Sequence, residues 1–231
     1  MKSQWNPGIV VLFGLPSSGK GTYASRLSKY YRVPRIAMSD LLGEAVAAGG
    51  AYGLAIRNAM GRGELVPDSI AVELLLGRLA LPDCAGGAVL DGFPRNAKQA
   101  GMLNGALLRE GRSVSNAMSL RLPAGDALRR LSDRMSCPKC SLTYSKSDFP
   151  PKRPGICNKC GARLVKRRDD SPAVIRERLR REAAGISEMN GFYRRQGVLT
   201  ALSAKGGRPA VARNLRKLLG VIGKMPRRRR A

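Results

Sequence analysis

The stretch Gly14-Leu15-Pro16-Ser17-Ser18-Gly19-Lys20-Gly21-Thr22 decides the fold of this chain. It follows an apolar run, residues 9–13, and precedes a helix-like stretch that extends to Tyr31. A strand, a glycine-rich turn and a helix start together form an anion cradle, because backbone N–H groups converge on phosphate oxygens and the helix dipole favours negative charge. The Lys20 ammonium can reach the terminal phosphates of such a ligand. A plain strand–helix turn is the alternative, and the complete Gly-x4-Gly-Lys spacing favours the phosphate site.

The chain is long enough for one α/β domain with insertions, and it is unusually basic. Its 231 residues include 42 Lys and Arg against 16 Asp and Glu, for a formal net charge of +26, and no histidine. Imidazole chemistry is therefore excluded, and the charge predicts polyanionic partners such as nucleotides, nucleic acid or an anionic membrane surface. No apolar stretch approaches the ~20 residues that span a bilayer, and residues 1–7 lack an apolar signal-peptide core. We expect a reducing compartment, the cytoplasm or an organellar matrix, and not secretion.

Short apolar runs alternate along the chain with amphipathic stretches. This order predicts an α/β fold in which crossover helices join the strands of a parallel sheet. We expect the strands at 8–13, about 35–37, 87–91, 114–120 and 198–203.

Capping residues and prolines predict where the helices begin. Ser39 and Asp40 are expected to cap a helix that runs to Ala48, where Gly49-Gly50 ends it. Proline is favoured in the first turn of a helix. We therefore expect further helices from Pro67 to Leu79, from Pro123 to Met135, and, as the longest, from Ser171-Pro172 onward.

Two stretches interrupt this order. Residues 38–66 predict a small helical insertion, and residues 136–169, rich in Cys, Pro, Gly and Lys, predict a separate loop-built subdomain. The segment 205–231 carries ten basic residues and no acidic one, and it ends in four consecutive arginines, 227–230. We expect this final stretch to be a disordered tail, because a run of like charges repels itself.

Four cysteines form two Cys-x2-Cys knuckles separated by sixteen residues: Cys137, Cys140, Cys157 and Cys160. This spacing fits a tetrahedral Zn²⁺ site, in which four thiolates leave no open position for catalysis. The intervening segment is too small to bury a core, so the metal would supply its folding energy. Two disulfides or unrelated thiols are the alternatives, which the lack of a secretion signal disfavours. The isolated Cys84 is expected to be a small core residue.

Asp91-Gly92-Phe93-Pro94-Arg95 follows the predicted strand at 87–91. In a doubly wound sheet, ligands bind beyond the carboxyl ends of the strands. Asp91 is thus suited to act through Mg²⁺ and its waters, and Arg95 to bind a phosphate with two guanidinium nitrogens. The alternative is a turn with a surface salt bridge.

Arginines bracket the cysteine-rich insertion. Arg130 and Arg134 precede it four residues apart, so we expect them to share one helix face. The insertion is followed by Arg167, Arg168, Asp169 and Asp170 and, on the next helix, by Arg178. A run of charges is usually a solvated face, whereas this bracketing arrangement favours a lid that closes over phosphates.

Together these motifs resemble the adenylate kinase family, in its long form with a zinc-bearing lid. The match runs from about Ile9 to Gly220. It rests on GLPSSGKGT, on DGFPR with Gln99 four residues after Arg95, on the four cysteines, and on RRDD followed by IRERL. The resemblance implies a P-loop NTPase fold with a five-stranded parallel sheet and flanking helices. It also implies four parts: a core of 1–37, 67–133 and 170–222, a monophosphate-binding domain of 38–66, a zinc lid of 134–169 and a basic tail of 223–231.

The resemblance further implies a nucleoside monophosphate kinase reaction, Mg-ATP + AMP ⇌ 2 ADP. Phosphoryl transfer depends mainly on positioning and electrostatic stabilisation, so the absence of histidine does not oppose it, and lid closure would exclude water. The residues implied to hold phosphates and the transferring group are Lys20, Arg95, Arg130, Arg134, Arg167 and Arg178. Those implied to bind nucleotide are Gly14, Ser17, Ser18, Gly19, Lys20, Gly21, Thr22, Ser39, Asp91, which orders Mg²⁺ through water, Gln99, which reads the adenine of AMP, and the hinge pair Asp169 and Asp170.

The acceptor motif departs from the family pattern Thr-Gly-Asp-x-Leu-Arg. Met38 occupies the Thr position, and Gly43 occupies the position of the arginine that binds the AMP phosphate. Losing a bidentate contact of this kind costs a few kcal/mol, on the order of 10²-fold in affinity or rate. We therefore expect a weakened or rearranged AMP site. Phosphorylation of a different nucleoside monophosphate is an alternative that Gln99 disfavours.

Nucleotide binding does not account for the charge, because +20 remains of +26 once the six phosphate-handling residues are removed. The alternative hypothesis is an adenylate-kinase-like protein, with weak or no activity, that acts as an RNA-binding component of a ribonucleoprotein, such as a ribosome-associated or assembly factor. A basic tail is equally compatible with a role in solubility. Outside such an assembly we expect a monomer.

Overall fold

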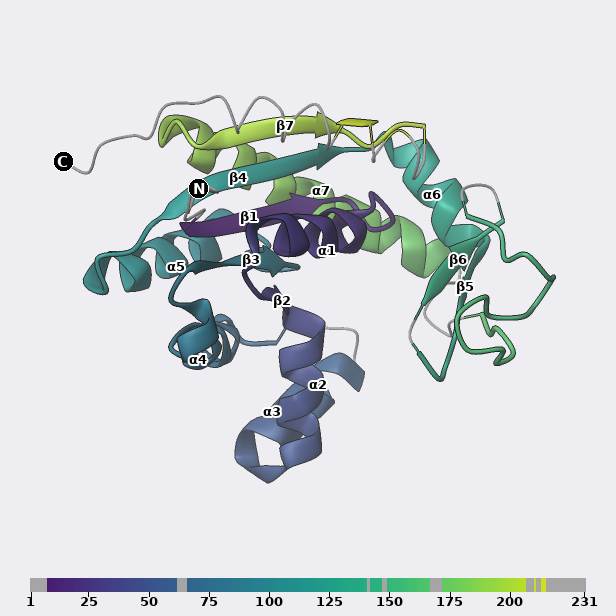
Figure 1. The fold of residues 1–231 in the computed structure, drawn as a ribbon, viewed down its shortest axis with the longest axis horizontal. Helices are drawn as coiled ribbons and strands as arrows, with labels where there is room; N and C mark the ends of the chain where they lie inside the picture. Colours follow the sequence, from purple (N-terminus) through teal and green to yellow (C-terminus); the bar gives the residue numbers. More distant parts are fainter. Residues whose placement is uncertain are drawn as a thin grey trace. The chain divides into compact units, whose positions relative to one another are not determined.

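A five-stranded parallel sheet in the order β2-β3-β1-β4-β7 underlies the fold (Figure 1), as the sequence predicts. The computed structural model describes residues 8–61, 66–140, 142–146, 149–166, 172–206, 210 and 213–214. The strands of the sheet are β1 (Gly8–Gly14), β2 (Arg35–Ala37), β3 (Gly87–Asp91), β4 (Val114–Arg121) and β7 (Leu199–Ser203). The predicted tail, 223–231, lies outside the described residues.

The main helices follow the strands, which is the crossover arrangement expected for parallel pairing. They are α1 (Lys20–Tyr31), α2 (Met38–Ala48), α3 (Gly50–Gly61), α4 (Asp68–Leu79), α5 (Ala97–Arg109), α6 (Ala124–Ser132) and α7 (Pro172–Arg195), with a 3-10 turn at Pro82–Cys84. In the part of the chain that the structure describes, no helix combines the length and the apolar character that a membrane crossing requires. The chain divides into two compact units, one of Met1–Gly14, Lys20–Ser119 and Glu182–Ala201, the other of Leu15–Gly19, Leu120–Arg181 and Leu202–Ala231.

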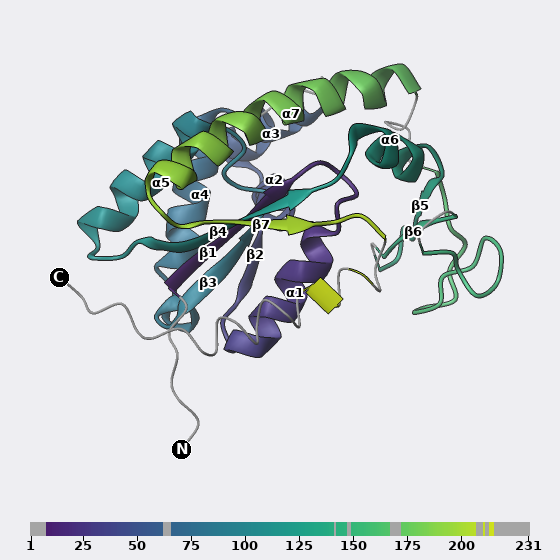
Figure 2. The same ribbon diagram turned by 90° about the horizontal axis from the view of Figure 1, so that it is seen from above.

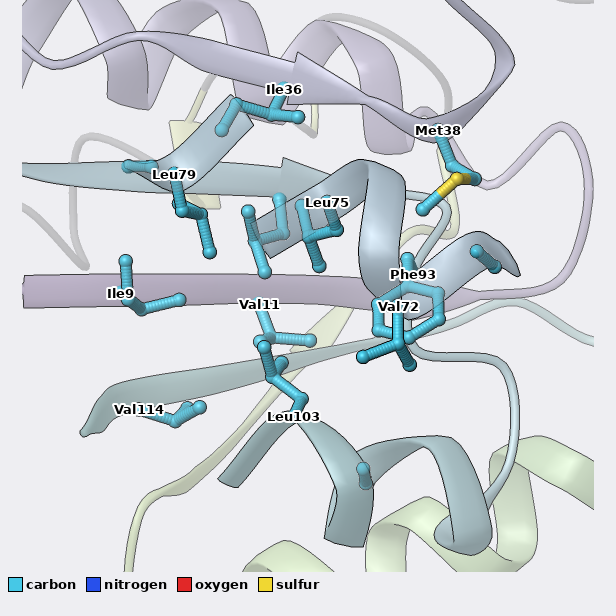
Figure 3. Packing of buried hydrophobic residues seen from close by; sticks show 14 of the residues in the cluster. Ile9, Val11, Ile36, Met38, Val72, Leu75, Leu79, Phe93, Leu103 and Val114 are labelled. Atoms are coloured by element: carbon cyan, nitrogen blue, oxygen red, sulfur yellow. The ribbon is translucent and has the colours of Figure 1, made fainter. Parts of the chain in front are cut away.

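In the first unit, β1 is buried on both faces, which explains its continuous apolar run. Its alternate residues Ile9, Val11 and Phe13 join one hydrophobic cluster with residues of α4, α5 and α7 (Figure 3). The ring centroids of Phe13 and Tyr193 are 6.0 Å apart. Figure 2 shows α1 on the opposite face of the sheet. Cys84 is fully buried in the same cluster, as predicted.

The helix after β2 begins earlier than predicted. Met38 is its first residue, Ala37 is the N-cap, and no side chain caps it. The Ser39 hydroxyl instead donates to Asp40 Oδ1 at 3.1 Å. The prediction that Ser39 and Asp40 form the cap was therefore wrong, because β2 passes directly into α2 and leaves both residues in its first turn. The predicted end was right, since α2 stops at Ala48.

In the second unit, α6 ends earlier than the predicted Met135. Its last residue is Ser132, and Arg134–Ser136 form a short strand, β5, paired antiparallel with β6 (Thr143–Ser145). Arg130 therefore lies on a helix and Arg134 on a strand, so the prediction that they share a helix face was wrong. The reason is tertiary: Ser136 also exchanges backbone hydrogen bonds with Val165, far along the chain, and this pairing overrides local helix preference.

In the first unit, the packing of α7 against the backbone of Arg95 can be tested at Gly185. A Cβ atom added there would collide with the backbone carbonyl oxygen of Arg95, whereas a Cβ on Gly105 in α5 would meet nothing within 4 Å. We expect Gly185→Ala to lower the free energy of unfolding by about 1–3 kcal/mol, as overpacking does. The matched Gly105→Ala variant should raise it by about 0.5–1 kcal/mol, because alanine favours a helix. Urea denaturation measures both, and equal effects of the two variants would contradict this account.

Candidate functional site

The glycine-rich loop connects β1 directly to α1. Lys20 begins the helix, and its Nζ donates to the carbonyl oxygen of Gly14 at 2.7 Å. Ser17 and Gly19 have positive φ angles, 63° and 88°, which bend the chain back toward the helix start. The Lys20 ammonium group is thus held at the start of the loop by the Gly14 carbonyl, a partner that an anionic ligand can replace.

Ser18 is a fully buried residue of this loop. The residue has 0% exposure, and its hydroxyl has no hydrogen-bond partner among the described residues. A buried hydroxyl without a partner is costly. It therefore fits a loop that binds a ligand with acceptor oxygens. Gly21 and Thr22 follow on the first turn of α1 and are partly buried.

Asp91 ends β3 and forms an ion pair with Arg35, a partner that the sequence did not indicate. Its Oδ2 accepts hydrogen bonds from Arg35 Nη2 at 2.7 Å and from Arg35 Nε at 3.2 Å. The register places Arg35 beside Val89 and Ala37 beside Asp91, so the guanidinium reaches diagonally across neighbouring strands. An arginine at the start of a predicted strand was visible in the sequence, but its pairing with β3 was not.

Arg95 and Gln99 are linked through the start of α5. Gln99 is 2% exposed, its Oε1 accepts from the Arg95 backbone N–H at 2.7 Å, and its Nε2 donates to Asp68 Oδ1 at 2.8 Å. The Arg95 side chain is exposed, and its Nε donates to the Gly92 carbonyl at 3.1 Å. Gln99 thereby fixes the backbone that carries the Arg95 guanidinium.

The predicted acceptor residues lie at the start of α2. Met38 is 4% exposed and belongs to the hydrophobic cluster (Figure 3). Ser39 is exposed, and so is Gly43, where an added Cβ would meet nothing within 4 Å. Arg57, also exposed, is the single basic residue between 38 and 61. The space at Gly43 is therefore open, and no neighbouring cation fills it among the residues of α2.

In the second unit, Arg130 is held against the glycine-rich loop. It is 5% exposed, and its guanidinium donates to the Ser17 carbonyl at 3.1 Å and to the Ala204 carbonyl at 3.3 Å. Arg134 on β5 is 8% exposed, and Arg178 on α7 is partly buried. The remaining predicted residues of this group, Arg167, Asp169 and Asp170, lie outside the described residues.

The four cysteines of the second unit converge as predicted. The sulfur atoms of Cys137, Cys140, Cys157 and Cys160 all lie within 4.8 Å of one another. The shortest separations are 3.3 Å, from Cys137 to Cys160, and 3.5 Å, from Cys140 to Cys157. All are free thiols, and a disulfide would require about 2.05 Å. Four thiolates at about 2.3 Å from one zinc ion would lie about 3.8 Å apart, so this donor set fits the metal.

Tyr144 lies beside this cluster on β6. Its hydroxyl accepts from the Asn158 N–H at 2.7 Å and lies 3.5 Å from the Cys157 sulfur. The hydrogen bond from Tyr144, the largest cause, together with backbone hydrogen bonds from Lys159 and Cys160, lowers the pKa of the Cys157 thiol to about 6, which favours the thiolate that metals bind. The buried cluster around it contains few residues besides the cysteines: Tyr144 and Leu164.

Comparison with known proteins agrees with this geometry. The family model described as adenylate kinase matches residues 12–198. A protein named adenylate kinase from Thermodesulfovibrio yellowstonii is 39% identical over 197 residues, 85% of this chain and 92% of the relative. Those of Anaeromyxobacter sp. (strain K) and Archaeoglobus fulgidus are each 36% identical, covering 92% and 82% of this chain and 99% and 88% of the relative. The chain therefore belongs to the adenylate kinase family.

Proposed function

We propose that this protein is an adenylate kinase that catalyses Mg-ATP + AMP ⇌ 2 ADP. The observation that carries the proposal is the glycine-rich loop, whose buried Ser18 hydroxyl has no hydrogen-bond partner among the described residues. The side chains of Lys20 and Arg130 donate to the carbonyl oxygens of Gly14 and Ser17, the residues that flank Leu15 and Pro16 in this loop. Both cations, Lys20 and Arg130, are already oriented without phosphate. Phosphoryl transfer requires this kind of preorganised positive charge more than covalent chemistry.

Each predicted site residue has a role in this proposal. Asp91 orders Mg²⁺ through water, Gln99 reads the adenine of AMP by exchanging its Asp68 partner, and Asp169 with Asp170 forms the hinge of the lid. The phosphates and the transferring group are bound by Lys20, Arg95, Arg130, Arg134, Arg167 and Arg178. The nucleotides also contact Gly14, Ser17, Ser18, Gly19, Gly21, Thr22 and Ser39. The proposed lid is 134–169, the monophosphate domain 38–66, and the remainder up to 222 the core.

We expect the acceptor half of the proposed site to bind its nucleotide more weakly than the donor half. Met38 presents no hydroxyl and is buried in the core, and Gly43 presents no side chain. The acceptor phosphate is then proposed to bind the exposed guanidinium of Arg95. The KM for AMP should consequently be high. The donor loop, in contrast, retains its charged groups.

Restoring the missing cation tests this proposal. We expect Gly43→Arg to lower the KM for AMP about tenfold, because a charge-assisted contact to phosphate is worth at least about 1.4 kcal/mol. The open space at Gly43 accommodates the side chain. The KM for ATP should stay within about twofold. A coupled assay for ADP, with AMP and ATP varied separately, measures both constants.

Lys20→Ala is the matched negative control of the same assay. It removes the cation of the donor loop, so kcat should fall by on the order of 10²-fold or more. Turnover of the wild-type protein no better than that of Lys20→Ala would refute the proposed activity. GMP, CMP and UMP tested beside AMP show whether the acceptor base is adenine.

The cysteine cluster is proposed to hold one structural Zn²⁺. Four thiolates satisfy the metal and leave no position for substrate, so its role is to fold the lid, whose buried cluster is small. All five cysteines are free, which also supports a reducing compartment.

The Tyr144 hydroxyl links zinc retention to pH. Removing it in Tyr144→Phe lets the pKa of Cys157 rise from about 6 toward its ordinary value. Protons then compete with zinc at higher pH, so the midpoint of acid-induced zinc release should move upward by about 0.3–1 pH unit. A chromogenic zinc indicator measures release, starting from one ion per chain. Tyr52→Phe, which loses a hydrogen bond to Glu73 in the other unit, should leave the midpoint unchanged.

A folded lid without metal would refute the zinc site.

A second candidate function, RNA binding within a ribonucleoprotein, is favoured by the charge of the proposed lid. The stretch 134–166 contains eight basic residues and one acidic residue. Seven of the basic side chains are exposed: Lys139, Lys146, Lys152, Arg153, Lys159, Arg163 and Lys166. They lie outside the set proposed to bind substrate phosphates. Without RNA we propose a monomer.

Salt dependence separates this second function from nonspecific basicity. On protein freed of nucleic acid, binding of single-stranded RNA should show a log–log salt slope of about −0.7 per phosphate contact. Lys152→Glu with Arg153→Glu removes two such contacts and should make the slope less steep by about 1.4. Arg26→Glu with Lys29→Glu, an equal change of charge on exposed residues of α1, should change it less. A preparation with no RNA affinity at physiological salt would exclude this function.

A further inference from the structure

We infer that Arg35 is a counter-ion that moderates how strongly Asp91 holds the magnesium ion of Mg-ATP. The inference rests on the proposed function, since it concerns the same donor site. Both hydrogen bonds of the pair end on one carboxylate oxygen, Oδ2, at 2.7 and 3.2 Å. Among the described residues, no other hydrogen bond reaches the carboxylate. Oδ1 is therefore the oxygen that can accept from a magnesium-bound water.

The position of the pair relative to α1 supports this role. A Cβ atom built on Gly21 would lie 3.4 Å from Asp91 Oδ2 and 3.5 Å from Arg35 Nη2. Gly21 directly follows Lys20, and in the general glycine-rich motif this position carries the Ser or Thr whose hydroxyl binds Mg²⁺. A side chain at position 21 would therefore point toward the ion pair of Arg35 and Asp91. Arg35 therefore brings a permanent positive charge to the border of the place where the metal is expected.

The physical consequence is competition. The guanidinium neutralises part of the Asp91 charge and repels a divalent cation, so magnesium gains less from this carboxylate than it would from a free one. The Asp91 side chain is 11% exposed and that of Arg35 is 34% exposed. Because solvent reaches the arginine, the effect should be moderate, about two- to fivefold in affinity.

The test compares ATP binding with and without magnesium, in the absence of AMP, so that no turnover contributes. The ratio of the two dissociation constants, measured by isothermal titration calorimetry, is the magnesium enhancement. In Arg35→Gln this enhancement should increase about two- to fivefold. The half-saturating magnesium concentration for ADP formation should fall by a similar factor. Arg35→Lys, which keeps the charge, should stay close to the wild type, and it also shows that position 35 tolerates substitution.

Arg26→Gln is the matched control, because it removes the same charge from an exposed position on α1. Its magnesium enhancement should equal that of the wild type. An unchanged enhancement in Arg35→Gln, or an equal rise in Arg26→Gln, would overturn the inference. So would a raised KM for AMP with unchanged magnesium dependence, which would assign Arg35 to the acceptor site. If the wild-type protein bound no ATP, the proposed function itself would fail.

Discussion

The parallel pairing of β3 with β1 and β2 is the constraint on which the rest of the structure depends. Its register sets Leu12 and Ala37 beside Asp91, so three strands end at the same edge of the sheet. The glycine-rich loop, the Asp91 carboxylate and the start of α2 follow from those ends. The pairing is tight enough to require glycine, since a Cβ on Gly87, whose φ is 115°, would collide with the Gly8 carbonyl.

Two of the cations proposed to bind phosphate, Lys20 and Arg130, have backbone carbonyl partners. Lys20 donates to the Gly14 carbonyl and Arg130 to the carbonyls of Ser17 and Ala204. Neutral carbonyls are weaker partners for a cation than phosphate oxygens, so a phosphate ligand can replace them at low cost. Arg35 differs, because its partner is the Asp91 carboxylate. Its guanidinium is thus held by a charged group, whereas the printed partners of Lys20 and Arg130 are backbone carbonyl oxygens.

The cysteines make up much of the small buried core of the cysteine-rich segment. Few buried residues accompany them, and the two strands, β5 and β6, are three residues each. Tyr144 stacks on Phe149 with ring centroids 5.3 Å apart and also supports the Cys157 thiolate. A segment of this size cannot offset its conformational entropy through apolar burial alone, which supports the proposal that a metal ion bound by the four thiols contributes to its folding.

The sequence by itself determined the α/β class, the five strands, the phosphate loop and the convergence of the four cysteines, because each rests on local periodicity or fixed spacing. The tertiary structure alone decided three other features. Arg134 joins a strand through pairing with β6 and Val165, β2 continues into α2 without the predicted Ser39 cap, and Arg35 reaches Asp91 across neighbouring strands. All three depend on contacts between residues distant in sequence, for which local propensity carries no signal.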